Sequence, residues 1–216
     1  MELWEDEQQK LIKCLTEQPL VVVIRVSNED LDNFFISQII SLIDRLNYLG
    51  VKNIEIGWSP NKNWIPLIKQ IQSQFKETYL GAASIDSYQA LEVITKLDLK
   101  YAMTPSWDLN LQKEAKALGK ILVPGVFTPY QIQSAIKCGY KIIKLFPASS
   151  VEKNYIKKVR GSQDSFPFVV AAGGIKAKDI NMWLHNGFNS VAIGKELIRK
   201  SEIDPFLIKW LLTKQK

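Results

Sequence analysis

A lysine stands inside an apolar run of the sequence, KIIKLFP. Lys144 is surrounded there by Ile142, Ile143, Leu145 and Phe146, which is the composition of a buried strand. Lysine is rarely buried without a partner, because an unpaired ammonium is costly to remove from water. Burial also lowers the pKa of a lysine and favours the neutral amine, a nucleophile that forms a Schiff base with a ketone. Lys144 is therefore our candidate nucleophile.

A carboxylate occupies a similar place in the run NIEIG. Side chains alternate along a strand, so Glu55 lies opposite the apolar face formed by Ile54 and Ile56. By the same rule Lys144 shares a face with Phe146, and we expect the two charged side chains to point into one interior. Such a pair is either a structural ion pair, or a nucleophile with a base that moves protons directly or through water.

Further polar residues stand where strands are expected to end. Arg25 closes LVVVIRV, Ser84 closes YLGAAS, and Thr104 precedes Pro105 at the end of KYAMTP. An arginine fork suits a carboxylate, which it binds with two parallel hydrogen bonds. Arg25 is therefore the candidate for holding an acidic substrate.

Glycines follow two more of these runs. Gly173 and Gly174 end FVVAAGG, and Gly194 precedes Lys195 after SVAI. Loops of this kind can bind a phosphate through backbone N–H groups and a helix N-terminus. The glycines predict a phosphate site, to which Lys195 adds positive charge unless it is an ordinary surface lysine.

These residues are distributed over a regular alternation of elements. The apolar runs predict strands at 20–26, 51–57, 79–84, 100–105, 120–126, 140–146, 168–174 and 190–197. Between them apolar residues recur at spacings of three and four, as along 31–46, and a glycine before the next strand repeatedly marks a helix end. A further helix is predicted at about 3–17.

Strands that alternate with helices predict a parallel sheet, and eight such units predict a (β/α)8 barrel with an extra N-terminal helix. We expect one domain over residues 1–216, with the chemistry at the C-terminal ends of the strands. An open doubly wound sheet is the alternative. The first strand is not followed by G-x-G-x-x-G, which weakens a dinucleotide-binding interpretation.

The composition favours an ordinary globular protein, with 46% hydrophobic and 23% charged residues. No apolar stretch approaches the roughly 18 residues of a membrane span, and the acidic N-terminus is unlike a secretory signal. Cys14 and Cys138 lack metal or redox spacing and are interpreted as reduced thiols. These features predict a cytoplasmic protein without membrane partners.

The net charge of +6 comes from 28 Lys and Arg against 22 Asp and Glu. The basic residues are scattered and no nucleic-acid-binding motif is present, so we expect no nucleic-acid partner. The single histidine, His185, has no partners for a metal site, and we identify no cluster of acidic metal ligands. The sequence therefore predicts neither a metal nor another cofactor.

Several segments together resemble a known family. KLFPAS, LVPGVFTPYQI, NIEI, GAAS, MTPS and AAGGI occur in the order found in aldolases for 2-keto-3-deoxy-6-phosphogluconate (KDPG) and 4-hydroxy-2-oxoglutarate (KHG). The resemblance covers nearly the whole chain, and K-x-F-P-A with P-G-V-x-T-P upstream is its most specific part. It implies a metal-free class I aldolase, usually a homotrimer, in which Lys144 forms the Schiff base and Glu55 moves protons.

The implied reaction cleaves KDPG to pyruvate and glyceraldehyde 3-phosphate. The resemblance places the pyruvate part of the substrate against Arg25, Ser84, Pro105 and Phe146, and the phosphate against Gly173, Gly174, Gly194 and Lys195. The alternatives are a KHG aldolase, which yields pyruvate and glyoxylate, and a barrel that only binds a phosphorylated metabolite.

The sequence departs from the family pattern in several places. Ser59 stands where some members carry a carboxylate-binding arginine, and Arg25 supplies the alternative arginine at the end of the first strand. Ala172 replaces a threonine before Gly-Gly, Lys195 replaces a small or hydroxyl residue, and the glycines usual after F-P-A-E are missing. These changes leave open the stereochemical preference and the need for a phosphate.

Overall fold

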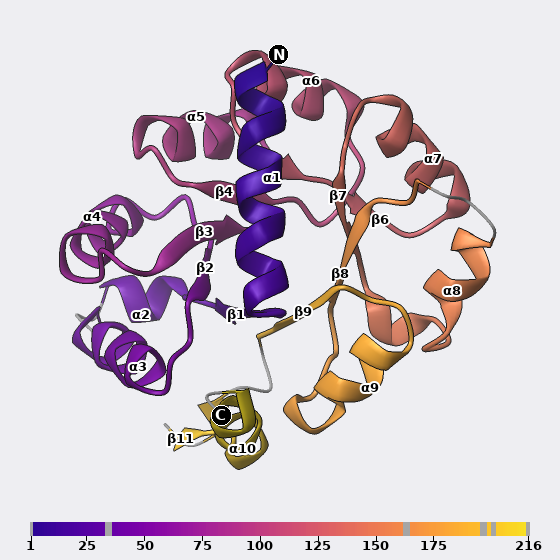
Figure 1. Ribbon diagram of the computed structural model, residues 1–216. Helices are drawn as coiled ribbons and strands as arrows, with labels where there is room; N and C mark the ends of the chain where they lie inside the picture. The colour runs from indigo at the N-terminus through magenta and orange to yellow at the C-terminus, as the bar shows by residue number, and fades with distance from the viewer. Residues whose placement is uncertain (1, 33–35, 162–164, 195–197, 200–201, 215–216) are drawn as a thin grey trace.

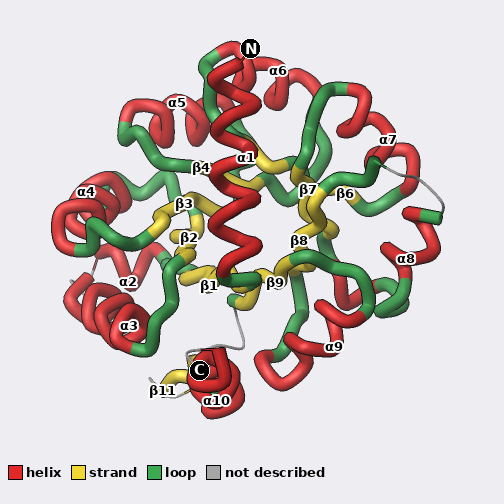
Figure 2. Tube along the Cα trace, viewed as in Figure 1, coloured by secondary structure: helices red, strands yellow, loops and turns green. Residues whose placement is uncertain are grey.

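The computed structural model describes residues 2–32, 36–161, 165–194, 198–199 and 202–214. A ring of helices surrounds a parallel sheet that curls into a barrel (Figures 1 and 2). The strands are β1 Leu20–Ile24, β2 Asn53–Gly57, β3 Tyr79–Ala83, β4 Tyr101–Met103, β5 Leu122–Val123, β6 Gly125–Val126, β7 Ile142–Leu145, β8 Phe168–Ala172 and β9 Ser190–Ile193. Their order in the sheet is β5-β4-β3-β2-β1-β9-β8-β7-β6.

The short strands β5 and β6 together occupy one place in the barrel. β5 pairs with β4 and β6 pairs with β7, so the chain from 122 to 126 joins the two edges of the sheet. Pro124 separates the two strands because it has no N–H to donate to the ladder. Its carbonyl still accepts a hydrogen bond from the Lys144 N–H at 2.9 Å. Nine assigned strands thus form the predicted (β/α)8 barrel.

The helices surround the strands. They are α2 Asn28–Asp32, α3 Ile36–Tyr48, α4 Trp64–Gln74, α5 Tyr88–Lys96, α6 Leu109–Ala117, α7 Pro129–Lys137, α8 Tyr155–Arg160, α9 Ile180–His185 and α10 Pro205–Lys214. Two 3-10 turns, η1 Ala148–Ser150 and η2 Ala177–Asp179, precede α8 and α9, and β10 Ile198–Arg199 pairs with β11 Glu202–Ile203. The sequence predicted one apolar helical face along 31–46, and the structure places residues of this range in two helices, α2 and α3. Residues 33–35 are outside the described residues.

Helix α1 (Glu2–Glu17), the predicted extra helix, crosses one end of the barrel (Figure 1). The Trp4 ring packs edge-on against Tyr140 with 5.1 Å between centroids. Gln8, fully buried, accepts the Lys141 N–H at 2.8 Å and donates to the Gly139 carbonyl at 3.3 Å. These partners precede β7, so α1 closes the N-terminal end of the strands and leaves the C-terminal end open.

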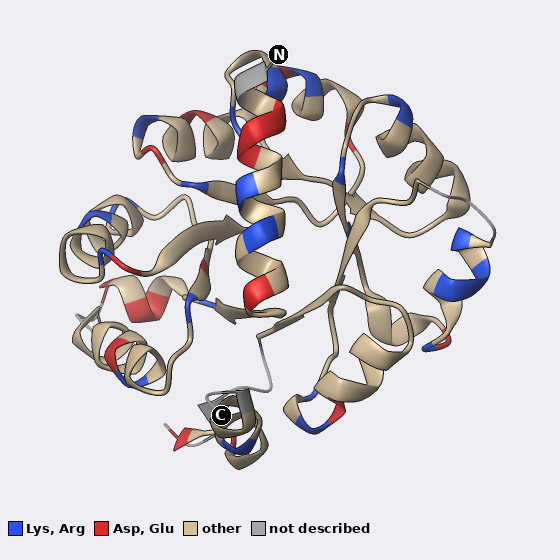
Figure 3. Cartoon of the chain, in the orientation of Figure 1, with Lys and Arg blue, Asp and Glu red and all other residues tan. Residues whose placement is uncertain are grey.

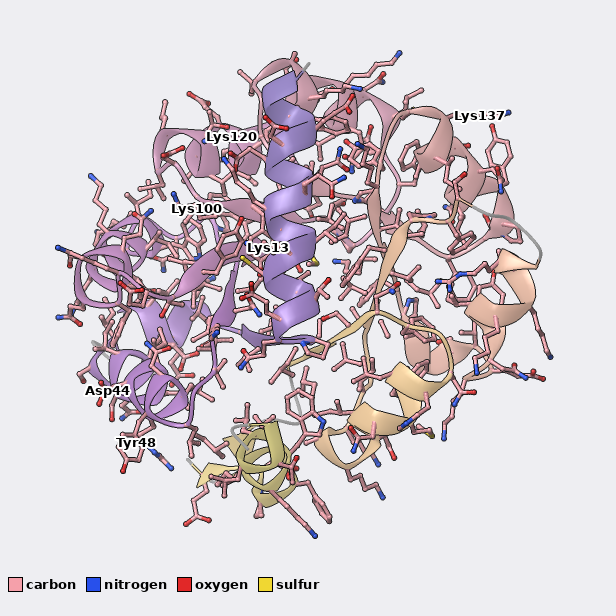
Figure 4. All side chains as sticks on the ribbon, in the orientation of Figure 1. Lys13, Asp44, Tyr48, Lys100, Lys120 and Lys137 are labelled. Atoms are coloured by element: carbon pink, nitrogen blue, oxygen red, sulfur yellow. The ribbon has the colours of Figure 1, made fainter. Side chains whose placement is uncertain are left out.

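Basic and acidic residues are scattered over the helices rather than gathered in one block (Figure 3). Lys13 on α1 and Lys137 on α7 lie well apart (Figure 4). This distribution agrees with the scattering of basic residues along the sequence. Within the described ranges, no helix has the length and apolar character needed to cross a bilayer.

Candidate active site

A cavity of about 450 Å³ opens at the C-terminal ends of the strands. Its walls come from β1, β2, β3, β7, β8 and β9 and from the turns after them. The lining residues are Val23, Arg25, Glu55, Ala83, Lys144, Phe146, Ala172, Gly173, Gly174, Ile175, Ala192 and Gly194. Seven of the ten residues predicted for the site are therefore brought together by the barrel.

Lys144 and Glu55 both line this cavity and are almost completely buried, with exposed fractions of 6% and 2%. Each sits in its strand between two buried apolar residues that do not line the cavity, in agreement with the alternation predicted from sequence. The Lys144 ammonium also lies 5.4 Å from the centre of the Phe146 ring. The lysine is thus almost completely buried beside an aromatic face.

Burial changes the protonation of both groups in opposite directions. Loss of hydration lowers the pKa of Lys144 to about 8, a shift opposed by the Glu55 carboxylate and assisted by the Arg25 charge. Loss of hydration raises the pKa of Glu55 to about 7, opposed by Lys144, Arg25 and Tyr101. Both shifts favour the uncharged forms. Near neutral pH, a much larger fraction of Lys144 is therefore neutral amine than for an exposed lysine.

Arg25 and Ser84 form the outer edge of the site. The Arg25 side chain begins at the residue after β1, and its Nη1 donates to Ser84 Oγ at 2.6 Å. Ser84 follows β3 and has a positive φ of 63°. An arginine that faces the cavity beside a hydroxyl is a geometry suited to a carboxylate.

The turn after β8 requires glycine at two positions, because a side chain at either would be strained and would meet neighbouring atoms. Gly173 and Gly174 have φ values of 91° and 73°, a region that favours glycine. A Cβ on Gly174 would lie 2.3 Å from Ser149 Oγ, and one on Gly173 would lie 2.9 Å from the Phe146 ring. The turn therefore packs its backbone directly against η1 and the Phe146 ring, which follows β7. Gly194 lies at the same cavity, whereas Lys195 is outside the described residues.

Ser84 is not part of the cavity lining and is linked to it through Arg25, and two further residues considered from sequence lie apart from the lining. Pro105 follows β4 and its backbone packs against Gly125, where an added Cβ would lie 2.4 Å from the Pro105 carbonyl carbon. Ser59 Oγ donates to Asn28 Oδ1 at 3.2 Å and so is engaged with α2. The cavity lining therefore includes neither.

Sequence reasoning missed other parts of the site. Val23, Ala83, Ala192 and Ile175 complete the cavity walls as apolar residues without a motif of their own. Tyr101 on β4, which interacts with Glu55, is also missed because it lies near the start of its predicted strand, whereas the expected chemistry is at the C-terminal ends of the strands. Only the assignment of inward positions along each strand could have indicated them.

The fold and the cavity together define a class of protein: a (β/α)8 barrel with a buried lysine and glutamate at the C-terminal ends of its strands. Residues 11–206 match the model of the family described as "KDPG and KHG aldolase". The chain belongs to this aldolase family, and its members are lyases.

Individual relatives agree with this assignment. The chain is 22% identical over 188 residues to the 2-dehydro-3-deoxy-6-phosphogalactonate aldolase of Escherichia coli strain K12, covering 87% of this chain and 88% of the relative. It is 24% identical over 177 residues to the 2-dehydro-3-deoxy-phosphogluconate aldolase of Haemophilus influenzae, covering 82% and 79%. The crystal structure of a Legionella pneumophila KDPG aldolase, with pyruvate captured as a covalent carbinolamine, superposes with a TM-score of 0.76 at 18% identity, covering 94% of each chain.

Proposed function

We propose that the protein is a metal-independent class I aldolase that cleaves KDPG to pyruvate and glyceraldehyde 3-phosphate. The observation that carries this proposal is the placement of Lys144, 6% exposed, in the same cavity as the buried Glu55 and the guanidinium of Arg25. Family membership supports the reaction class, and the named activities of the relatives support the substrate class.

The first steps use the neutral amine of Lys144. Its lone pair attacks the C2 ketone of the substrate, and loss of water from the carbinolamine leaves an iminium. Glu55 supplies and accepts the protons of this step, directly or through water, because its raised pKa lets both of its forms exist near neutral pH. The buried site favours this chemistry, since the attacking amine is not held as a hydrated ammonium.

Carbon–carbon cleavage follows from the iminium. The electrons of the C3–C4 bond move toward the iminium nitrogen as Glu55 takes the proton of the C4 hydroxyl, which releases an aldehyde and leaves an enamine. Glu55 returns a proton to C3, and water then frees pyruvate from Lys144. Each proton that Glu55 accepts is thus returned within one turnover.

Binding of the substrate ends is assigned to the edges of the cavity. Arg25 and Ser84 would hold the carboxylate next to C2, with Phe146 against the pyruvate carbons. The backbone at Gly173, Gly174 and Gly194 would receive the distal phosphate, a role that Lys195 would support. Pro105, which lies outside the cavity lining, would contact the pyruvate part of a substrate that extends toward β4.

A second candidate substrate is the C4 epimer, 2-keto-3-deoxy-6-phosphogalactonate. The relative with this named activity matches 87% of the chain, and Ala172 at the cavity wall removes a hydroxyl that would bear on C4 stereochemistry. The same wall motivates a third candidate, the unphosphorylated KHG.

Cleavage of all three compounds at equal concentration tests the proposal. Pyruvate release would be followed with lactate dehydrogenase, and the aldehyde product would be identified separately. We expect the phosphorylated substrates to be cleaved with a larger kcat/KM than KHG. Binding of all three without pyruvate release would instead indicate the non-catalytic barrel.

We also propose a cytoplasmic homotrimer, for which sedimentation should give three times the mass of one chain.

A further inference from the structure

A tyrosine on β4 reaches across the barrel interior toward Glu55. In the strand ladder Glu55 on β2 is in register with Gly81 on β3, and Gly81 is in register with Tyr101 on β4. A Cβ on Gly81 would lie 2.6 Å from two carbons of the Tyr101 ring. The ring therefore lies over the glycine, in the space that any side chain at position 81 would fill, and it is aimed at the strand that carries Glu55.

The Tyr101 hydroxyl is an unusual group to find at this depth. Tyr101 is 2% exposed, and within the described part of the chain its hydroxyl and Glu55 Oε1 are both buried without a hydrogen-bond partner of normal geometry. A buried hydroxyl without a partner is destabilising, so phenylalanine would pack there at a lower cost. Tyr79 already stacks on the Tyr101 ring with 5.6 Å between centroids, and this contact does not need the hydroxyl.

The charges around the two groups are consistent with a donor and an acceptor. Glu55 faces Lys144 from β7, Arg25 from the end of β1, and Tyr101 from β4, and Tyr101 is among the groups that lower the Glu55 pKa. Burial keeps the pKa of Tyr101 well above its usual value, so the phenol retains its proton. Besides Glu55, the ionisable groups that raise the Tyr101 pKa are Tyr79 and Cys14.

We propose that Tyr101 is a positioning residue for Glu55, whose hydroxyl donates a hydrogen bond to the Glu55 carboxylate while that group accepts and returns substrate protons. Gly81 makes this possible by leaving room for the ring. Tyr101 contacts no reacting atom in this account and acts through Glu55. The inference rests on the proposed function, because it assumes that Glu55 exchanges protons with a Lys144 adduct.

A half-reaction with pyruvate alone tests the inference. Once pyruvate is bound to Lys144 as an iminium, Glu55 removes a methyl proton to give the enamine and returns a deuteron from D₂O. Deuterium incorporation into the methyl group, followed by NMR at saturating pyruvate, reports proton transfer by Glu55 on the Lys144 adduct. Borohydride trapping of the Lys144 adduct is measured in parallel and reports the proposed function.

Tyr101→Phe removes the hydroxyl and keeps the ring. We expect normal trapping on Lys144 but exchange slowed about tenfold, a part of the roughly 10²–10⁴-fold that general acid–base catalysis supplies. Because the hydroxyl favours the charged form of Glu55, its loss raises the Glu55 pKa, and the acid limb of the exchange profile should move to higher pH. The control Tyr79→Phe should match the wild type in rate and profile.

A double-mutant cycle with Glu55→Gln separates positioning from packing. If Tyr101 acts through Glu55, Tyr101→Phe should have no further effect on exchange in the Glu55→Gln background. Unchanged exchange and an unmoved acid limb in Tyr101→Phe would overturn the inference, as would a Tyr101→Phe protein that fails to fold. Absence of trapping in the wild type would overturn the proposed function, and the inference with it.

Discussion

The two ends of the barrel differ in how deeply they bury charged side chains, as two lysines three residues apart along the chain show. Lys141 precedes the strand at the end covered by α1, where its side chain is 44% exposed and pairs with Glu5 at 3.2 Å. Lys144 lies toward the open end and is 6% exposed. The covered end buries aromatic rings and the Gln8 amide but keeps its ion pair at the surface.

The comparison separates stability from function. An exposed ion pair contributes little to stability, and a buried one often contributes less than apolar residues of the same size. A fold selected only for stability would therefore not need an ammonium and a carboxylate inside β7 and β2. The proposed mechanism accounts for their burial, because it requires a neutral amine and a carboxyl that exchanges protons.

The largest expected effect comes from replacing the two lysines in turn. Lys144→Met should reduce cleavage of KDPG by about 10⁴-fold or more, because the nucleophile is lost. Lys141→Met, the matched control just before the same strand, should retain nearly full kcat/KM. Steady-state kinetics on both variants, with circular dichroism as a check of folding, makes the measurement. Equal losses in the two variants would contradict the division between the two ends.

Glu55 should give the next largest effect. Glu55→Gln keeps the shape of the side chain but cannot accept a proton, so cleavage should fall by about 10²–10³-fold while the pyruvate adduct still forms. Glu5→Gln at the covered end is the control and should change neither the cleavage rate nor the formation of the pyruvate adduct. A Glu55→Gln enzyme that cleaves at the wild-type rate would remove the carboxylate from the mechanism.

The covered end should respond in stability instead. Trp4→Ala removes a buried ring that packs on Tyr140 and lies beneath the Lys116 ammonium. The free energy of unfolding should fall by about 3–5 kcal/mol, as for other buried aromatic truncations. Denaturant unfolding measures this change, and kcat of the folded enzyme should stay the same. Tyr48→Ala, at a 91% exposed position, should change stability by less than about 0.5 kcal/mol.

The smallest expected effect is a shift in pH dependence. Because burial lowers the pKa of Lys144 to about 8, the rate of pyruvate adduct formation should rise with pH through that region in the wild type. The Arg25 charge contributes to the lowering, so Arg25→Met should raise the Lys144 pKa and move the curve to higher pH. Pre-steady-state trapping at several pH values, on the wild type and on Arg25→Met, measures this shift of the curve.

Arg160→Met is the matched control for this shift. Arg160 lines a separate hollow with Lys141 and Ile12, toward the covered end, and its removal should leave the curve in place. A curve that moves to lower pH in Arg25→Met would show that Arg25 does not act on Lys144 through its charge.

The periodicity of the sequence was enough to predict the barrel and its inward-facing lysine and glutamate. Alternation along a strand decides which face a residue takes, so Lys144 and Glu55 could be assigned to one interior before any coordinates. The break at Pro124 was not predicted. The run KILVPGV was expected to form one strand, but Pro124 has no N–H to donate and the run forms two, β5 and β6.

The contacts within the site could not be predicted, because they depend on how the barrel closes. The bond from Arg25 to Ser84 joins residues that are 59 positions apart. The reach of Tyr101 over Gly81 requires the relative register of three strands, which no local pattern in the sequence encodes. The engagement of Ser59 with α2 likewise depends on a neighbouring element.

Borohydride reduction in the presence of pyruvate tests the central claim most directly. Peptide mapping by mass spectrometry would locate the reduced adduct, with Lys144→Met and Lys141→Met treated alongside the wild type. We predict a single pyruvyl adduct on Lys144, present in the wild type and in Lys141→Met and absent from Lys144→Met. A folded wild-type protein that forms no adduct, or forms it equally on surface lysines, would contradict the account.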